Sequence, residues 1–354
     1  MNTHENHILT AVQIKQLRSI LIDQYIALSF GAGVDSTAMI VALKEAGIRP
    51  NVITFADTGC EKRITYSHVE KMNNVLRSWN WPQIDIVRKV TLPTTGYSDL
   101  FGNCIKHETM PSLAFGRKSC SIKYKTGPQD IFIMGAKSGP SKKAPHSIWL
   151  SAKCENKQII KLIGYDSGQA DIRRSKNLAD CDDNFQYIYP LQLLGWARAD
   201  CIKAISSTLG AEMVPAKSSC YFCPASKIWE LFWLAAFEPW LLDQALYMER
   251  LAMTGKHSRY DATLGGGPWM TQIRQPNGFL KSSQVVGLGR SLSWNQWAIS
   301  NSVVDENFKV FVGADDKHRF IAMSDLLRTS DNALDQRTTH TSTNSKVIPI
   351  LFES

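Results

Sequence analysis

The chain alternates between apolar runs and amphipathic stretches over its first two hundred residues. Runs rich in β-forming residues occur at positions 25–30, 51–56, 84–90 and 159–165, and a further segment starts at 187. Apolar residues recur at helical spacing within 1–24, 38–46, 65–79 and 199–209. Strands that alternate with helices predict an α/β fold, with an open, mostly parallel sheet and helices on both of its faces.

The pattern changes in the second half of the chain. Residues 226–253 have helical spacing and many aromatic side chains, which is more typical of a core or domain contact than of a base-stacking surface. Residues 138–158 are rich in Ser, Lys and Pro and predict a loop, and residues 329–346 are polar and predict poor order. We therefore expect a nucleotide-binding α/β domain over 1–215. A helical region with a polar C-terminal tail is expected over 216–354.

Composition narrows the class of protein. The chain is 44% hydrophobic and 20% charged, as in soluble globular proteins, and it has neither a membrane-spanning apolar run nor a signal peptide. We expect a cytoplasmic protein that does not contact a membrane, in which the eight Cys are not a disulfide framework. The net charge of +8 is compatible with nucleic acid or polyphosphate partners, although many cytoplasmic enzymes are mildly basic.

Small and polar residues lie between the first predicted strand and its helix. Glycines there let the backbone approach an anion closely, and the first N–H groups of the helix would point at it. The segment lacks the Gly-Lys-Ser/Thr ending of a Walker loop and the glycine spacing of a dinucleotide fingerprint. The predicted phosphate-binding residues are Ser29, Phe30, Gly31, Ala32, Gly33, Asp35, Ser36 and Thr37.

A second polar segment, Asp57-Thr58-Gly59, follows the second predicted strand. Ligands of open α/β sheets bind outside the carboxyl ends of the strands, so we expect this segment to face the same crevice as the first loop. The carboxylate of Asp57 or Glu61 could help to hold Mg²⁺ on a triphosphate, because that ion prefers oxygen ligands. The alternative is that Asp57 only caps a turn.

Cys220 and Cys223 form a Cys-x-x-Cys pair, whose turn can bring both sulfurs to one metal. A closed site needs further ligands, and Cys120, in a cationic segment that favours thiolate, is the first choice, with Cys104 as the fourth. Thiolate spacing alone does not separate Zn²⁺ from an iron–sulfur cluster. A redox dithiol is the alternative. The other thiols, Cys60, Cys154, Cys181 and Cys201, could be ordinary small buried residues.

Taken together, the motifs resemble the PAPS reductase-like family of the PP-loop ATP pyrophosphatase superfamily. Gly31 to Ser36 is similar to the PP-loop pattern Ser-Gly-Gly-x-Asp-Ser, with Gly31 and Ala32 as departures and Ser29 as a substitute hydroxyl. The family order continues in Phe55–Gly59, Cys120–Lys125 before Pro128, Gly164-Tyr165-Asp166 with Arg173-Arg174, Tyr189-Pro190-Leu191 and Ser219–Pro224.

The resemblance implies an enzyme that binds ATP and Mg²⁺, cleaves ATP to AMP and pyrophosphate, and adenylates an acceptor. Asp35, Asp57, Lys123 and Arg173 are then the catalytic candidates, and Gly164 joins the nucleotide-binding residues. Relatives with a 4Fe-4S cluster thiolate tRNA or insert sulfur into DNA. An adenine nucleotide, with a nucleic acid (tRNA or DNA) or a sulfur-donor protein, are therefore the expected partners.

Two alternatives remain open at this point. Sulfonucleotide reductases of the family use a C-terminal Cys as nucleophile, but the last Cys here is Cys223, so only an atypical reductase with an internal Cys is possible. The other alternative is a nucleotide-binding protein that holds a structural zinc and does not turn over.

Overall fold

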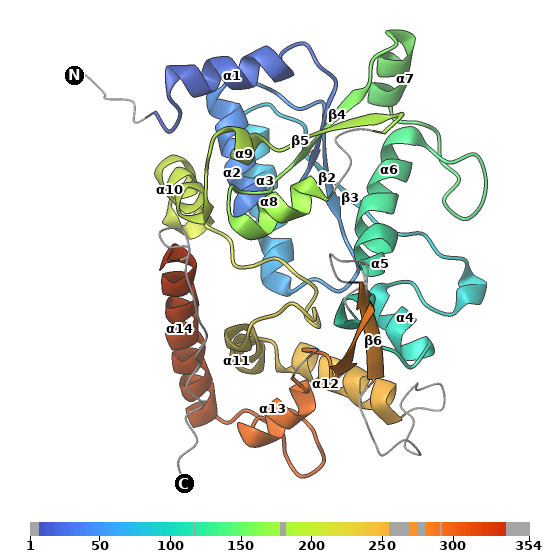
Figure 1. The fold of residues 1–354 in the computed structure, drawn as a ribbon, viewed down its shortest axis with the longest axis vertical. Coiled ribbons are helices and arrows are strands. Elements are labelled where there is room, and N and C mark those ends of the chain that lie inside the picture. The colour runs from blue at the N-terminus through green and yellow to red at the C-terminus, as the bar shows by residue number, and fades with distance from the viewer. Residues whose placement is uncertain are drawn as a thin grey trace.

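The fold is built on a five-stranded sheet in which all neighbouring strands are parallel, in the order β3-β2-β1-β4-β5 (Figure 1). The structure is a computed structural model, and it describes residues 7–115, 118–177, 182–254, 269–274, 280–290 and 292–337. The strands of the sheet are β1 (Ile26–Ser29), β2 (Val52–Ala56), β3 (Ile84–Val87), β4 (Ile159–Ile163) and β5 (Phe185–Ile188). The predicted α/β fold is confirmed.

Helices connect the strands and cover the sheet. Those of the first part are α1 (Ala11–Leu21), α2 (Val34–Glu45), α3 (Arg63–Ser78), α4 (Leu100–Lys106), α5 (Ser119–Ser121), α6 (Gly127–Met134), α7 (Ser147–Cys154), α8 (Gln169–Lys176), α9 (Pro190–Leu193) and α10 (Arg198–Leu209). Those of the second part are α11 (Ile228–Phe237), α12 (Pro239–Thr254), α13 (Trp294–Ser300) and α14 (Ala314–Arg337), with a separate antiparallel hairpin of β6 (Trp269–Arg274) and β7 (Leu280–Val285).

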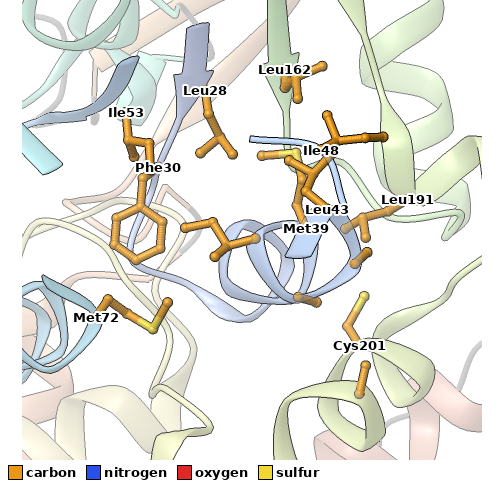
Figure 2. Packing of buried hydrophobic residues seen from close by; sticks show 14 of the residues in the cluster. Leu28, Phe30, Met39, Leu43, Ile48, Ile53, Met72, Leu162, Leu191 and Cys201 are labelled. Atoms are coloured by element: carbon orange, nitrogen blue, oxygen red, sulfur yellow. The ribbon is translucent and has the colours of Figure 1, made fainter. Parts of the chain in front are cut away.

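Helix α2 lies at the centre of the main hydrophobic core. Figure 2 shows Met39 and Leu43 of α2 between strand residues such as Leu28 and Leu162 on one side and Cys201 of α10 on another. Nine of the ten residues from Val34 to Leu43 are buried, and Asp35 is the exception. Because α2 is packed on nearly every side, its N-terminus is held firmly at the carboxyl end of β1.

The opposite face of the sheet is covered by α6 and α7 (Figure 1). Ala27 and Ile159 of the strands pack there with Ile133 and Ile148 of the two helices. The stretch 138–158 was predicted as a loop, but it contains α7, so this prediction is wrong in its second half. The sequence of α7 has a weak helical pattern, and the helix is stabilised mainly by the packing of its apolar residues on the sheet.

A second core lies around α11, α12, α13 and α14. It includes Leu100 and Cys104 of α4 as well as Phe222 and Leu231, so residues from both sides of position 215 share it. The division at 215 stays a prediction. The predicted helix over 226–253 is two helices, because Pro239 starts α12 after a break at Glu238.

The C-terminal tail is helical for longer than its polar sequence suggests. Helix α14 runs to Arg337, so residues 329–337 are helical, and the poor order predicted for 329–346 stays a prediction. The remainder of the predicted tail lies outside the described residues. Among the described residues, no helix is long and apolar enough to cross a membrane.

Glu230, in the first turn of α11, has a buried carboxylate. Its side chain is 0% exposed and forms ion pairs of 2.6 Å with both Lys62, just before α3, and Lys217. Burial alone would raise the pKa of Glu230, but the two lysines outweigh it and hold the pKa below its ordinary value. The triad ties the start of α11 to the end of the β2 loop and to the chain before Cys220.

Replacing Glu230 with Gln is expected to destabilise the fold by about 3 kcal/mol or more, because Lys62 would be left buried without a counter-charge. Denaturant unfolding of the full chain measures the change. Glu155→Gln is the control, since Glu155 and Lys157 form an exposed pair and little should be lost. Equal losses in the two variants would contradict the role given to the triad.

Candidate functional site

The predicted phosphate loop joins β1 to α2 in the expected way. Gly33 is the N-cap of α2, and the hydroxyl of Thr37 donates to the Gly33 carbonyl oxygen at 2.9 Å. Ala32 has φ +54°, a left-handed conformation that costs an L-residue roughly 1 kcal/mol. The departure from Gly at position 32 is therefore tolerated, and the backbone still makes the turn that exposes the first N–H groups of α2.

The end of β4 supports this loop from the side. A Cβ on Gly164 would stand 2.8 Å from the amide nitrogen of Ser36 and 2.9 Å from its Cα, closer than real contacts allow. In the structure, the absence of a side chain at Gly164 lets the chain after β4 approach the backbone of Ser36 in α2 closely. The nucleotide-binding role predicted for Gly164 stays a prediction. A Cβ on Gly31, by contrast, would meet only the Ser36 hydroxyl at 3.8 Å, so that position is open.

Three carboxylates meet beside the N-terminus of α2. Ligand-type oxygens of Asp35, Asp166 after β4 and Asp171 of α8 lie within 4.8 Å of one another. Arg198, the first residue of α10, lies 2.9 Å from Asp35, and Arg174 donates to Asp171 at 2.6 Å. Burial raises the pKa of Asp35 to about 7, and the two neighbouring carboxylates add to this against the opposing effect of Arg198.

This oxygen cluster fits a hard cation. Mg²⁺ binds carboxylate oxygens, and three carboxylates meet here with their ligand-type atoms close together. Asp35 was predicted as a catalytic and phosphate-binding residue but not as a cation ligand, and Asp166 and Asp171 were not predicted as ligands either. No spacing rule connects them, because Asp35 and Asp171 approach only through the pairing of β1 with β4.

Asp57 is placed at the carboxyl end of β2 but is already fully engaged. Its carboxylate accepts hydrogen bonds from the Gly59 amide at 2.8 Å, the Tyr66 hydroxyl at 2.8 Å and the Arg88 guanidinium at 2.7 Å. The side chain is 0% exposed, so it acts in this structure as an anchor of the turn. The alternative that Asp57 caps a turn is thus observed, and its catalytic and nucleotide roles stay predictions.

The Cys-x-x-Cys loop contacts the same strand end. The hydroxyl of Thr58 lies 3.1 Å from the sulfur of Cys220, and the Tyr221 amide donates to the Cys60 carbonyl at 3.0 Å. Glu61 and Cys220 form an isolated antiparallel bridge, and Lys125 lies 3.4 Å from the Glu61 carboxylate. Thr58 and Cys220 are 162 residues apart in sequence, and their contact holds the two motifs together.

Several thiols share the second core with this loop. Cys60, Cys104 and Cys220 are buried in it, and Cys120 packs against it. Burial raises the pKa of Cys220, Cys223 and Cys60, and raises that of Cys104 to about 12, so these groups are protonated unless a metal binds. The buried Tyr124 hydroxyl in the same core has no hydrogen-bond partner among the described residues.

The donor set fits a thiolate-bound group, but not in the arrangement of a formed zinc site. Tetrahedral zinc with Zn–S bonds of 2.3 Å needs sulfurs about 4 Å apart. Within the described part of the chain, no three thiols come within 4.8 Å of one another. An iron–sulfur cluster spreads its thiolates more widely, because each binds a different iron. The ligand set Cys120, Cys104, Cys220 and Cys223 stays a prediction, and Cys60, which the sequence analysis set aside, lies next to Cys220.

The remaining thiols differ from one another. Cys201 is buried in the main core, as its interpretation as a small buried residue required. Cys154 is exposed at the end of α7, so the same interpretation is wrong for that residue. Cys181 lies outside the described residues.

The two predicted catalytic cations, Lys123 and Arg173, are both exposed, and the Nε of Arg173 donates to the Gln169 carbonyl within α8. Their catalytic roles stay predictions, and Lys125, Arg174 and Arg198 are among the described cations that form ion pairs with site residues. Of the loop's flanking residues, Ser29 donates its hydroxyl to Gln129 at 2.8 Å and Phe30 is buried.

His68 of α3 contacts the loop through the side chain of Thr37. Its Nε2 lies 2.9 Å from the hydroxyl of Thr37, and burial, with a smaller effect of the Lys71 cation, lowers its pKa to about 4. The imidazole is therefore neutral at pH 7. A cavity of about 80 Å³ lies beside it, lined in part by Ala32, Lys71 and Val214, which is too small for a nucleotide.

Gly164→Ala is expected to destabilise the fold by about 1–3 kcal/mol and to weaken nucleotide binding, because the new methyl group must displace the backbone of Ser36. Denaturant unfolding and calorimetric titration with ATP measure the two effects. Gly31→Ala is the matched control in the same loop, and it should fold normally. A Gly164→Ala variant with unchanged stability would show that the close approach is not tight in solution.

The lowered pKa of His68 predicts an acid-sensitive loop. Between pH 6.5 and 4 the unfolded chain binds a proton at this residue that the folded chain does not, so the free energy of unfolding must fall as the pH drops through this range. His68→Gln should lose that part of the pH dependence. Unfolding curves of both proteins at several pH values measure it, and parallel pH profiles would contradict a buried neutral imidazole.

Several solved structures are similar to this chain, among them the following two. One is phosphoadenylyl-sulfate (PAPS) reductase from Candida auris in a phosphate complex, at 16% identity, with 56% of this chain and 87% of that chain covered and a TM-score of 0.31. The other is the U34-tRNA thiolase NcsA from Methanococcus maripaludis with its 4Fe-4S cluster, at 12% identity, with 72% and 76% covered and a TM-score of 0.33. No family model and no curated protein matches the chain. These likenesses say nothing about the site, and the relationship to the PAPS reductase-like family of the PP-loop superfamily stays a prediction from the motifs.

Proposed function

We propose that this chain is a PP-loop enzyme that cleaves ATP to AMP and pyrophosphate and adenylates an acceptor in sulfur transfer or nucleic-acid modification. The observation that carries the proposal is the convergence of three features at the carboxyl edge of the sheet. These are the turn before α2, the oxygen cluster of Asp35, Asp166 and Asp171, and the Cys-x-x-Cys loop against β2.

In this proposal, the N-terminus of α2 binds the β- and γ-phosphates of ATP. An oxygen of the acceptor attacks the α-phosphorus, the bond to the bridging oxygen breaks, and pyrophosphate stays in the loop as the leaving group. A sulfur or nitrogen nucleophile then attacks the adenylated atom of the acceptor, and AMP leaves together with the acceptor's oxygen. The backbone N–H groups and the half-exposed Arg198 neutralise the charge that the bridging oxygen gains in the first step. The protein's contribution is mainly positioning and charge neutralisation.

Mg²⁺ would be held by the carboxylates of Asp35, Asp166 and Asp171, where it would offset the negative charge of the phosphates. An iron–sulfur cluster would be held by buried thiols around Cys220, where it could supply sulfur chemistry close to the adenylated atom. Lys125, whose pKa is raised first of all by Glu61, stays charged beside these thiols and favours their thiolate forms. The net charge of +8 is compatible with tRNA or DNA as the acceptor.

The test is product analysis on the full chain, purified without oxygen and supplied with ATP and Mg²⁺. AMP and pyrophosphate should form in equal amounts. Asp35→Asn should lower this rate by roughly a hundredfold, because it removes a carboxylate from the proposed cation site. Asp183→Asn, which changes an exposed carboxylate near β5, is the control and should leave the rate unchanged.

The same samples distinguish the alternatives. Iron with acid-labile sulfide is expected, whereas zinc alone without ATP cleavage would support the nucleotide-binding protein. Sulfite released from an adenylyl-sulfate donor with a thiol reductant would support the reductase. ATP cleavage to ADP, or equal rates in wild type and Asp35→Asn, would overturn the proposal.

A further inference from the structure

Helix α12 has aromatic side chains on its exposed side. Trp240, Gln244 and Tyr247 recur at helical spacing, so they lie on one side of the helix, and we call these three residues the aromatic face. The rings of Trp240 and Tyr247 are 41% and 48% exposed. Two large rings exposed together indicate an interaction surface. The residues of α12 that are buried in the second core include Leu242, Ala245, Leu246 and Met248.

An arginine from another element lies against the first ring. The guanidinium of Arg63, the first residue of α3, is 4.5 Å from the centre of the Trp240 ring. The backbone N–H of Arg63 donates to the Glu238 carboxylate at 3.0 Å, which fixes the position of the arginine beside α12. A flat cation next to a half-exposed indole is a surface on which nucleobases stack.

A second arginine lies near the other ring. Arg250 follows Tyr247 by one turn of α12 and donates to Asn295 at 2.8 Å. Asp243 lies on the same flank of the helix, and its carboxylate is paired with Lys309 at 3.1 Å. Because this pair offsets its own charges, the arginines contribute positive charge on each side of the aromatic face, which favours a polyanionic partner.

The aromatic face has direct neighbours in both motifs of the candidate site. The hydroxyl of Tyr221, in the Cys-x-x-Cys loop, donates to Gln244 at 2.6 Å. Ile64, which follows Arg63, lines the small cavity that Ala32 of the phosphate loop also lines. A ligand bound on the aromatic face is therefore held next to the residues on which the proposed chemistry depends.

The distance between the two rings selects a strand with separated bases. Seven residues lie between their positions in the helix, which is about 10 Å along its axis. Bases stacked in a duplex are about 3.4 Å apart and present only their edges to a protein. Bases that stack on each of these rings must therefore be splayed apart, as they are in single-stranded loops of RNA. Duplex DNA would first have to be opened, at a cost in free energy.

We propose that the aromatic face of α12 binds a single-stranded segment of RNA, with one base stacked on Trp240 and another on Tyr247. Arg63 and Arg250 neutralise phosphates of the same strand. The inference rests on the proposed function, because it specifies the nucleic acid of that proposal as RNA and places it beside the phosphate loop and the thiols.

The test is fluorescence anisotropy of the full chain with a labelled RNA hairpin that has an unpaired loop, measured without nucleotide. Trp240→Leu and Tyr247→Leu should each weaken binding by roughly tenfold, the usual loss of one base stacked on an aromatic ring. Trp240→Phe keeps a ring and should bind nearly as wild type does, whereas an apolar protein contact would tolerate Leu as well as Phe. Thermal unfolding checks that the variants are folded, which is expected because both rings are exposed.

The salt dependence of binding tests the charges. Arg63→Ala should reduce the slope of log affinity against log salt concentration by about 0.7, the value for one phosphate contact of a single strand. Lys44→Ala is the matched control, because Lys44 is also an exposed cation over an indole ring, 5.3 Å from that of Trp79 at the opposite end of α3. It should leave both the affinity and the slope unchanged.

Three results would overturn the inference. They are equal hairpin affinities of wild type and the Trp240→Leu/Tyr247→Leu double variant, no hairpin binding by wild type, and tighter binding of duplex RNA or single-stranded DNA than of the hairpin. The proposed function is tested separately, since AMP and pyrophosphate are measured without RNA. Hairpin binding through these rings without ATP cleavage would overturn the proposed function and leave the RNA surface in place.

Discussion

The candidate site depends on a negative charge held in the interior. Glu230 is fully buried, and it stays ionised only because lysines reach it from two different parts of the chain. One lysine comes from the loop after β2 and the other from the segment before Cys220. Their common partner at the start of α11 forces these parts together, and the geometry of the Cys loop follows from that. An apolar contact would give no such direction, since hydrophobic burial is not specific about which groups meet.

Much of the sheet could be predicted from the sequence. The strands at β1, β2 and β4 are short, apolar and β-branched because both their faces are buried, and such runs are visible without a structure. Helices were predicted well where one face is polar, as in α3. Other helices were missed, or two helices were predicted as one, where tertiary contacts determine the helix and its ends. Helix α7 has few residues of strong helical pattern, and the break at Pro239 separates two helices that share one aromatic pattern.

The site was predicted in its parts but not in its connections. The loop at Gly31–Thr37 and the Cys pair were recognisable because each is local in sequence. The partners of these motifs are not local. Arg198 pairs with Asp35 from the start of α10, far along the chain, and nothing in the sequence near either residue indicates this pairing. Asp57 is the opposite case, because its motif is conspicuous in the sequence. Its carboxylate, however, already accepts hydrogen bonds from Tyr66 and Arg88.

The cation beside the Cys loop shows how local geometry can mislead a motif comparison. After α5, residues Ile122–Thr126 form a π-helical turn, and the Gly127 amide donates to the carbonyl five residues back, at Ile122. Residues five apart are stacked in such a turn, whereas α-helical spacing is three to four. Lys125, within this turn, lies 3.4 Å from the Glu61 carboxylate, whereas Lys123 is exposed. A lysine chosen from the sequence by α-helical spacing after Cys120 is therefore Lys123, and the lysine that contacts the site is Lys125.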